Sequence, residues 1–156
     1  LKHGLVDLGV VTTPTSDTEL IASREICEIH EIPVCGKAFS ELSGRQVTLS
    51  ELTKYPLISL FKQTKTYEIY SEWFRQNDCS FSPDIEAATA DMVLPMVNNN
   101  LGIGFVPEQF LENYPNQGIF RLDLKEEVPV RKICLLKRKK QSMSAAGREL
   151  ERMILK

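Results

Sequence analysis

The stretch that most constrains the fold runs from Glu86 to Pro107 and has the sequence EAATADMVLPMVNNNLGIGFVP. Apolar residues repeat at helical spacing between positions 92 and 97, and Thr89 stands where an N-cap belongs, so the pattern predicts a helix that begins there. Pro95 should kink this helix, because proline removes one backbone hydrogen bond. Asparagines 98–100 tolerate a left-handed helix end, and residues 102–106 then predict a buried strand, after which Pro107 opens another helix.

The start of this predicted helix is suited to bind an anion. Its first backbone N–H groups have no partner within the helix, and they lie beside the Thr89 hydroxyl. The alternative is that Thr89 only caps a structural helix.

A second strand and helix repeat this arrangement earlier in the chain. Leu57–Phe61 predicts a compact buried strand, and the polar loop Lys62–Thr66 follows it. Thr66 is placed to cap a helix whose aromatic stripe begins at Tyr67. Ser50 is similarly placed to cap a short helix before the strand. Two hydroxyl-rich loops of this kind in one half of the molecule are expected to converge on one cleft.

The beginning of the chain predicts another buried strand. Val6–Val11 (VDLGVV) is a near-continuous apolar run, as expected for a strand buried on both faces of a parallel sheet. Thr12 and Thr13 follow its carboxyl end, where ligands bind in open α/β sheets. The alternative is that these two residues form a polar turn.

The remaining segments complete an α/β pattern. The stretch 20–35 predicts one long strand or two short ones interrupted at Pro33, and strands are also predicted over 119–124 and 128–136. A final helix is predicted to start at Ser142 or Ser144 and to bury Ala146, Leu150, Met153 and Ile154. The basic turn 137–140 either contacts a polyanion or is a solvated strand end. Strands alternate with helices throughout, which defines the class as α/β.

Composition excludes several classes of protein. The 156 residues suffice for one domain or two small lobes, and a net charge of −2 disfavours a nucleic-acid-binding module. The sequence has neither a bilayer-spanning apolar run nor a secretory signal. Its four cysteines form no CxxC pair and have no metal-ligand spacing with His3 or His30. Reduced thiols are predicted, with a Cys27–Cys35 redox pair as the alternative, and no metal or cofactor is expected.

Motifs for catalysis are missing as well. The sequence contains no GxSxG, no phosphate-binding loop and no HExxH, so we do not expect an enzyme. If the chain were an enzyme, Cys79 would be the most nucleophile-like residue, although its turn is distant from the predicted ligand loops.

Three segments in order carry a resemblance to a known family. They are VDLGVV at 6–11, the segment from Leu52 through Tyr55-Pro56-Leu57-Ile58, and AATAD at 87–91 leading to LGIGFVP at 101–107. With these segments the chain resembles, over nearly its whole length, the effector-binding domain of LysR-type bacterial transcriptional regulators. The resemblance implies a type 2 periplasmic-binding-protein-like fold, with two α/β lobes joined by two crossing strands. Lobe I would comprise 1–32 and 130–156, and lobe II would comprise 33–129.

The resemblance also implies where an effector binds. The family's effector lies between the lobes, and the matching positions in this sequence are Thr12, Thr13, Phe61, Lys62, Thr64, Thr89, Val106 and Pro107. Hydroxyls, helix starts and Lys62 favour an anionic ligand, such as a small carboxylate or an inorganic oxyanion. The family further implies a cytoplasmic homodimer or tetramer in the intact protein.

The chain departs from the family pattern at its N-terminus. The helix-turn-helix domain, which would contact DNA, and the first strand and helix of lobe I have no counterpart in the sequence, so we expect an N-terminally truncated protein with an incomplete lobe I. The expected function is effector sensing that controls transcription through the oligomer. The alternatives are a solute-binding protein of the same fold and, less favoured, an enzyme on that fold.

Overall fold

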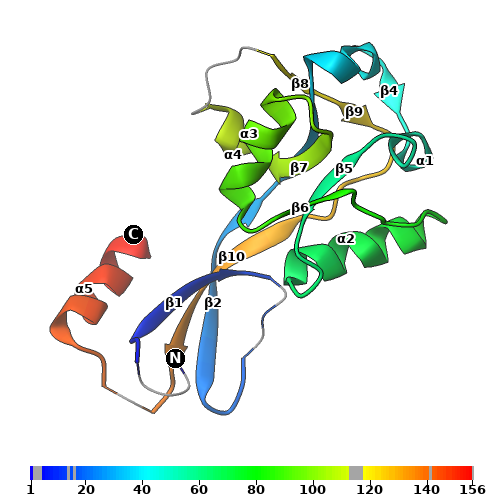
Figure 1. Cartoon of the computed structure of the whole chain (residues 1–156). Coiled ribbons are helices and arrows are strands. Elements are labelled where there is room, and N and C mark those ends of the chain that lie inside the picture. Colours follow the sequence, from blue (N-terminus) through cyan, green and yellow to red (C-terminus); the bar gives the residue numbers. More distant parts are fainter. Residues whose placement is uncertain (2–4, 14, 16, 113–117, 141, 156) are drawn as a thin grey trace. The chain divides into compact units, whose positions relative to one another are not determined.

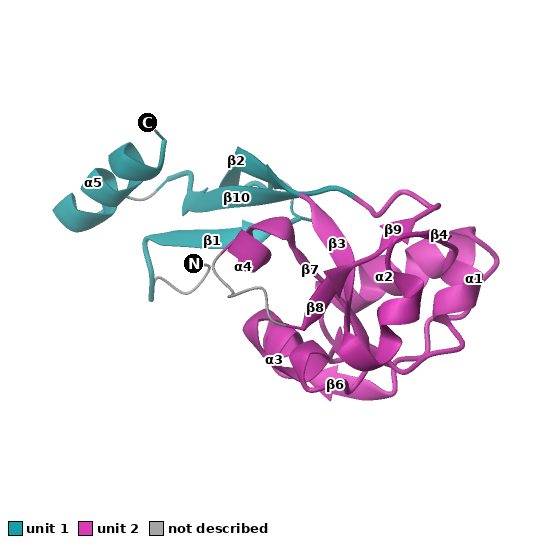
Figure 2. Ribbon diagram, turned by 90° about the horizontal axis from the view of Figure 1, so that it is seen from above, with its two compact units in different colours: residues 1–29, 130–156 teal, residues 30–129 magenta. Residues whose placement is uncertain are grey.

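The computed structural model describes residues 1, 5–13, 15, 17–112, 118–140 and 142–155. His3, which was considered above as a metal ligand, lies outside the described residues. The chain divides into two compact units, which Figure 2 shows in different colours. Unit 1 comprises residues 1–29 and 130–156, and unit 2 comprises residues 30–129.

Unit 1 is built on a three-stranded antiparallel sheet (Figure 1). The strand order is β1 (Leu8–Thr12), β10 (Arg131–Arg138) and β2 (Ile21–Ile29). Helix α5 (Ala145–Ile154) follows, and its predicted N-cap is confirmed, because the Ser144 hydroxyl accepts a hydrogen bond from the Gly147 N–H.

Two predictions for unit 1 are wrong. Strand β1 is not in a parallel sheet, since it pairs antiparallel with β10 alone, and the Val10 side chain is 58% exposed. The predicted buried face of α5 is also exposed, with Leu150 at 49% and Met153 at 62%. Apolar periodicity indicates which side of an element can be buried, but it does not supply the element that covers it.

Unit 2 contains a five-stranded mixed sheet, a two-stranded parallel sheet and the remaining helices. The larger sheet has the order β6 (Ile85–Ala87), β5 (Leu57–Leu60), β7 (Ile103–Pro107), β3 (Glu31–Gly36) and β8 (Ile119–Arg121). The smaller sheet pairs β4 (Gln46–Val47) with β9 (Asp123–Leu124). The helices are η1 (Lys37–Leu42), α1 (Leu49–Leu52), α2 (Lys65–Gln76), η2 (Ala90–Met92), α3 (Val93–Asn98) and α4 (Glu108–Glu112).

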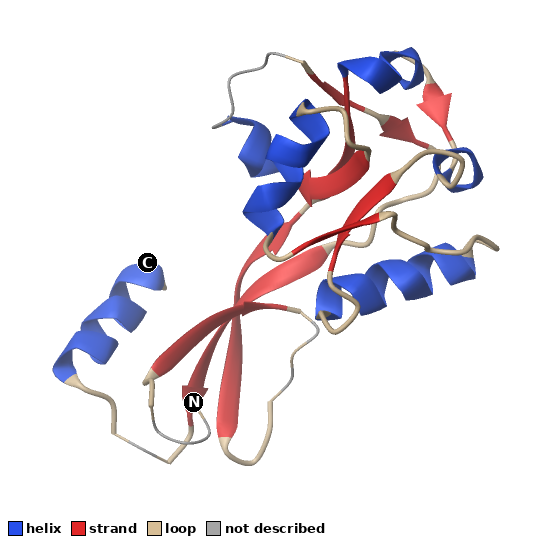
Figure 3. Ribbon diagram, in the orientation of Figure 1, coloured by secondary structure: helices blue, strands red, loops and turns tan. Residues whose placement is uncertain are grey.

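Helices lie on both sides of the larger sheet of unit 2 (Figure 3). The core of the unit consists of two clusters of buried side chains, one on each face of this sheet. Neighbouring residues of β5 divide between them, because Leu57 faces the cluster that contains α2 and Ile58 faces the cluster that contains α3. On the α2 side, Phe74 is fully buried and Trp73 is 6% exposed. On the α3 side, Gly104 allows a close approach, since a Cβ atom there would lie 2.4 Å from a methyl group of Val93.

The break in the long β segment falls at His30 rather than at Pro33. Strand β2 ends at Ile29 and β3 begins at Glu31, whereas Pro33 lies within β3 opposite Phe105. Proline breaks a strand only where its missing N–H is needed for a ladder hydrogen bond, and the pairing with β7 tolerates Pro33.

Two helix caps also differ from the prediction. Thr64 rather than Thr66 caps α2, because its hydroxyl accepts a hydrogen bond from the Tyr67 N–H at 3.2 Å. Thr48 rather than Ser50 caps α1, by the same bond from the Glu51 N–H. The cap must lie three residues before the N–H that it accepts, and in both segments an earlier threonine meets that requirement.

The predicted helix behind Thr89 is split into two short elements. The turn η2 comes first, and the Thr89 side chain makes no capping hydrogen bond to it. Pro95 is the third residue of α3, where its missing N–H has no intrahelical partner to lose, so the predicted kink does not arise. The expected left-handed helix end is confirmed at Asn100, where φ is 60°.

Candidate functional site

The carboxyl ends of three parallel strands meet at one edge of the unit 2 sheet. Strand β5 pairs in parallel with β6 on one side and with β7 on the other. Leu60 lies opposite Ala87 in the first pair, and Ile58 lies opposite Gly104 in the second. The segments that follow these strands therefore begin at the same edge, which we call the unit 2 edge: residues 61–64, 88–89 and 107.

The segment after β5 contributes Phe61, Lys62 and Thr64. Phe61 is 42% exposed and Lys62 is exposed. Among the residues that the structure describes, no acidic group forms an ion pair with Lys62. The Thr64 hydroxyl, in contrast, is used within the fold, because it accepts from the Tyr67 N–H and donates to the Phe61 carbonyl at 2.7 Å.

Helix α2 adds the electrostatics of its N-terminus to this edge. It has 12 residues, and the Thr64 cap satisfies one of its first backbone N–H groups. The positive end of the helix dipole and the Lys62 ammonium thus lie in the same short segment. This combination favours an anion.

The segment after β6 contributes Thr89, which is exposed. Because the Thr89 hydroxyl makes no capping bond to η2, it is available to a ligand as donor or acceptor. The helix that follows has only six residues, so the attraction of its dipole for an anion is smaller than that of α2.

The carboxyl end of β7 contributes Val106 and Pro107 to this edge. Val106 is fully buried in the core cluster on the α3 side, so a role in binding would fall to its main chain. Pro107 is the last residue of β7 and is partly exposed.

In unit 1 the two predicted threonines lie at the end of β1. The Thr13 hydroxyl accepts a hydrogen bond from the Lys132 N–H at 2.9 Å, and the Thr13 N–H donates to the Lys132 carbonyl at 2.9 Å. Thr13 therefore extends the ladder between β1 and β10. Thr12 is exposed, and its hydroxyl lies 3.5 Å from the Nη1 atom of Arg131.

Two charged residues that lie inside strands escaped the sequence reasoning. Arg131, the first residue of β10, is 6% exposed, and Glu31, the first residue of β3, is 7% exposed. Charged side chains are almost never buried unless they are paired, so burial marks both as specific features. Each is the first residue of its strand, with a polar or charged neighbour in the sequence, so nothing local marked its burial in advance.

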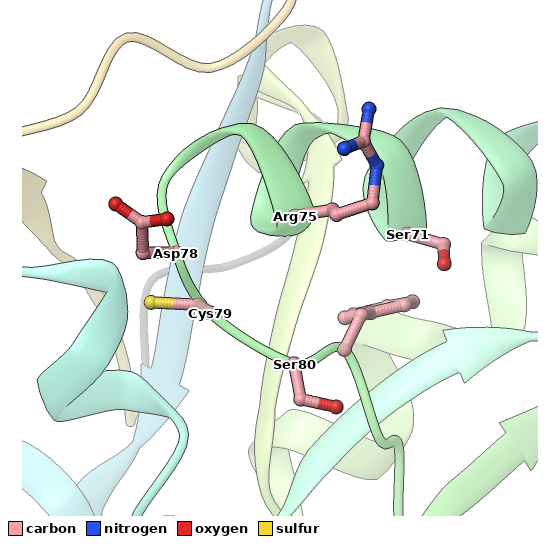
Figure 4. Close-up of a pocket in the computed structure, with 6 residues that line it drawn as sticks. Ser71, Arg75, Asp78, Cys79 and Ser80 are labelled. Carbon is pink, nitrogen blue, oxygen red and sulfur yellow. The ribbon is translucent and has the colours of Figure 1, made fainter.

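A separate pocket of about 470 Å³ lies at the other end of α2 (Figure 4). Its lining residues are Ser71, Arg75, Asp78, Cys79, Ser80 and Phe81. The labelled polar side chains diverge rather than converge on one point, and the Arg75 guanidinium is paired with Glu72. A helix of 12 residues is about 18 Å long, which separates this pocket from the unit 2 edge.

The surroundings of Cys79 do not activate its thiol. Burial raises the pKa of Cys79, and the neighbouring Glu126 and Asp78 carboxylates raise it further. A nucleophilic cysteine needs the opposite surroundings, with a cation or a helix N-terminus beside it.

All four cysteines are free thiols, two of them exposed or partly exposed and two buried. Burial raises the pKa of the Cys35 thiol to about 11. Within the described part of the chain, no cluster of three or more histidine, cysteine or acidic side chains could hold a metal ion. The helices of that same part are all too short or too polar to cross a bilayer.

The fold defines an α/β domain, and comparison with known proteins specifies its family. The sequence matches the LysR substrate binding domain family over residues 1–156. The chain therefore belongs to the LysR substrate-binding domain family, which confirms the resemblance found in the sequence. No match was found among curated protein sequences.

Solved structures of regulatory and effector-binding domains share the fold. The regulatory domain of CcmR from Synechocystis PCC6803, in complex with 2-PG, has a TM-score of 0.84 at 13% identity, over 99% of this chain and 74% of that one. The effector-binding domain of QuiR, in complex with shikimate, has a TM-score of 0.80 at 16% identity, over 99% and 73%. The cofactor-binding domain of the Cbl transcriptional regulator has a TM-score of 0.77 at 18% identity, over 100% and 74%. The fold is thus the type 2 periplasmic-binding-protein-like fold of these domains.

Proposed function

We propose that this chain is the effector sensor of a LysR-type transcriptional regulator and that its effector is a small anion. The observation that carries the proposal is the unit 2 edge, where three parallel strands end beside the α2 N-terminus and the exposed Lys62 ammonium. The Thr89 hydroxyl supplies a further hydrogen bond at this edge. Backbone N–H groups, a hydroxyl and an ammonium together suit a carboxylate, a phosphate or a sulfate.

A second group of candidate contacts lies in unit 1. Here Thr12 is exposed at the end of β1, so its hydroxyl can donate a hydrogen bond to an anion or accept one from a ligand. We assign units 1 and 2 to the two lobes of the family, whose resemblance implies that an effector binds between the lobes. The predicted lobe I boundary, after Ile32, lies three residues beyond the end of the first segment of unit 1 at residue 29. Both ligand-bound relatives, CcmR with 2-PG and QuiR with shikimate, support a small-molecule site in this fold.

Control of transcription would follow from differential affinity. An effector that binds one arrangement of the domain better than another shifts the population toward it, and the oligomer passes this bias to DNA-binding domains. In the intact regulator, a helix-turn-helix domain would contact DNA. The protein would form homodimers and tetramers and would be located in the cytoplasm. The sensor itself would carry out no catalysis.

The alternative of a periplasmic solute-binding protein is not favoured, because the matching family consists of transcriptional regulator domains. An enzyme on this fold also lacks support, since the relatives are regulators and the thiol of Cys79 is not activated.

The proposal is tested by thermal denaturation in the presence of small anions. Sulfate, phosphate, a series of mono- and dicarboxylates and shikimate are suitable ligands, with neutral sugars for comparison. A ligand that binds only the native state stabilises it by about 2.7 kcal/mol at a hundredfold excess over its Kd. We expect anions to raise the melting temperature and neutral sugars to leave it unchanged.

Variants locate the site. Lys62→Ala and Thr89→Ala should each reduce the anion-induced rise, whereas Thr53→Ala should not, because Thr53 ends α1 at the opposite end of β5. An equal rise in all three variants would place the anion elsewhere. Stabilisation by neutral sugars alone would refute the anionic preference.

A further inference from the structure

A buried carboxylate lies at the point where unit 2 begins. Glu31 is 7% exposed, and the Tyr70 hydroxyl donates a hydrogen bond to its Oε2 atom. Removing a carboxylate from water is costly, and an apolar side chain of similar size would fit a buried strand position at lower cost. Stability alone therefore does not explain why this position holds a buried glutamate paired with a tyrosine.

Glu31 is fixed to the segment that enters unit 2. It is the second residue of that unit and the first of β3, and it lies opposite Pro107 in the ladder with β7. The neighbouring His30 carbonyl accepts a hydrogen bond from the Glu108 N–H at 2.9 Å. Any shift of this entering segment is thus transmitted to the Glu31 carboxylate.

Tyr70 is the first buried residue of α2. The five residues before it in the helix are exposed or only partly buried, whereas Tyr70 is 4% exposed. Its ring packs against Phe105, with ring centroids 5.0 Å apart, and against Phe81 at 5.9 Å. The N-terminal half of α2, which follows the Thr64 cap, is therefore held against the core by Tyr70 and by Tyr67, whose ring centroid lies 5.3 Å from that of Phe81.

We propose that the Tyr70–Glu31 hydrogen bond couples the N-terminal turn of α2 to the segment at which unit 2 begins. An anion bound at the α2 N-terminus orders that turn, and the phenol transmits the ordering to Glu31 and β3. Tyr70 and Glu31 are positioning residues in this scheme, because neither touches the effector. The role assigned to the anion rests on the proposed function, whereas the coupling itself does not.

The coupling is tested first without ligand, by hydrogen exchange in segment 30–34. Thr64→Ala removes the α2 cap and should speed exchange in this segment about fivefold in the wild-type background. In the Tyr70→Phe background, where the ring remains and only the hydroxyl is lost, the same Thr64→Ala change should leave the segment unaffected. Glu31→Gln keeps a side-chain oxygen that accepts the hydrogen bond and should preserve most of the coupling.

Thr48→Ala is the matched control. Thr48 caps α1 through the same bond, also 3.2 Å long, but the tyrosine that donates to Glu31 lies in α2 and not in α1. It should leave exchange in segment 30–34 unchanged in both backgrounds. If Thr64→Ala speeds exchange equally with and without the Tyr70 hydroxyl, or if it has no effect on this segment in either background, the coupling is refuted.

Sulfate then serves as the anionic probe. In the wild type it should protect both the first turn of α2 and segment 30–34, and in Tyr70→Phe it should protect only the turn. Equal protection of segment 30–34 in both proteins would overturn the transmission route. If sulfate protects neither segment in the wild type, the sulfate site fails as a proposal while the ligand-free result still decides the coupling.

Discussion

Replacing Thr64 by alanine should destabilise unit 2 by about 1 kcal/mol, and replacing Thr89 should not. The Thr64 hydroxyl makes two hydrogen bonds, one from the Tyr67 N–H at 3.2 Å and one to the Phe61 carbonyl at 2.7 Å. Loss of an N-cap threonine costs about 0.5–2 kcal/mol. The Phe61 carbonyl keeps the Thr64 N–H as a donor at 2.9 Å, so the second bond adds little to the cost.

Urea denaturation followed by tryptophan fluorescence measures this effect directly. The chain has one tryptophan, Trp73, which lies in α2 and is 6% exposed, so its emission reports on unit 2. With a urea m-value of about 1–3 kcal/mol/M, a loss of about 1 kcal/mol lowers the midpoint by about 0.3–1 M. Thr64→Ser retains the hydroxyl and should restore most of the loss.

Thr89→Ala provides the opposing case. Thr89 is exposed and makes no capping hydrogen bond, so its replacement should change the unfolding free energy by less than about 0.5 kcal/mol. The reasoning would be refuted if Thr89→Ala cost as much as Thr64→Ala. Such a result would mean that the Thr89 hydroxyl stabilises the fold and is not held available for a ligand.

Three further predictions concern the core of unit 2. Gly104→Ala should cost about 1–3 kcal/mol by crowding Val93, and combining it with Val93→Ala in urea denaturation should cost less than the sum of the two changes. Ser59→Ala should be neutral or stabilising in the same assay, since the buried Ser59 hydroxyl has no hydrogen-bond partner among the described residues; a loss above about 1 kcal/mol would contradict this. Burial raises the pKa of the Cys35 thiol from its ordinary value of 9.0 to about 11, so the folded state holds its proton longer than the unfolded state. The stability that Cys35 contributes should therefore be full below pH 9 and lost as the pH rises toward 11, by about 1–3 kcal/mol relative to Cys35→Ala; a difference between wild type and variant that is constant from pH 8 to 11 would contradict it.

The elements of unit 2 could be predicted well because periodicity and buried runs define them locally. The strand at 57–60, the aromatic stripe of α2 and the strand before Pro107 are found close to their predicted bounds. Their caps were less predictable. In the sequence Thr64-Lys65-Thr66 two threonines stand near the helix start, and only the spacing to the Tyr67 N–H selects the first.

The pairing between strands was harder to predict from the sequence than the strands themselves. The run VDLGVV has the composition of a doubly covered strand, yet β1 pairs with β10 alone and leaves Val10 exposed. The composition of a strand indicates whether it can be buried, but it does not identify the strands that pair with it. Here the partner strand, β10, is more than 100 residues away in the chain.

The candidate site shows the same division between local and distant information. Residues at the unit 2 edge could be predicted, because each follows the carboxyl end of a strand and parallel strands bring such ends together. Arg131 and Glu31 were missed because each begins its strand, and a charged residue at a strand start is ordinarily solvated. Thr12 and Tyr70, which form hydrogen bonds with them, come from β1 and α2. Reading the sequence segment by segment thus identifies candidate ligand contacts at the ends of strands, and it overlooks groups whose partners come from elsewhere in the chain. The charged residues that a strand buries are accordingly the first positions at which to look for coupling between a binding site and the rest of the fold.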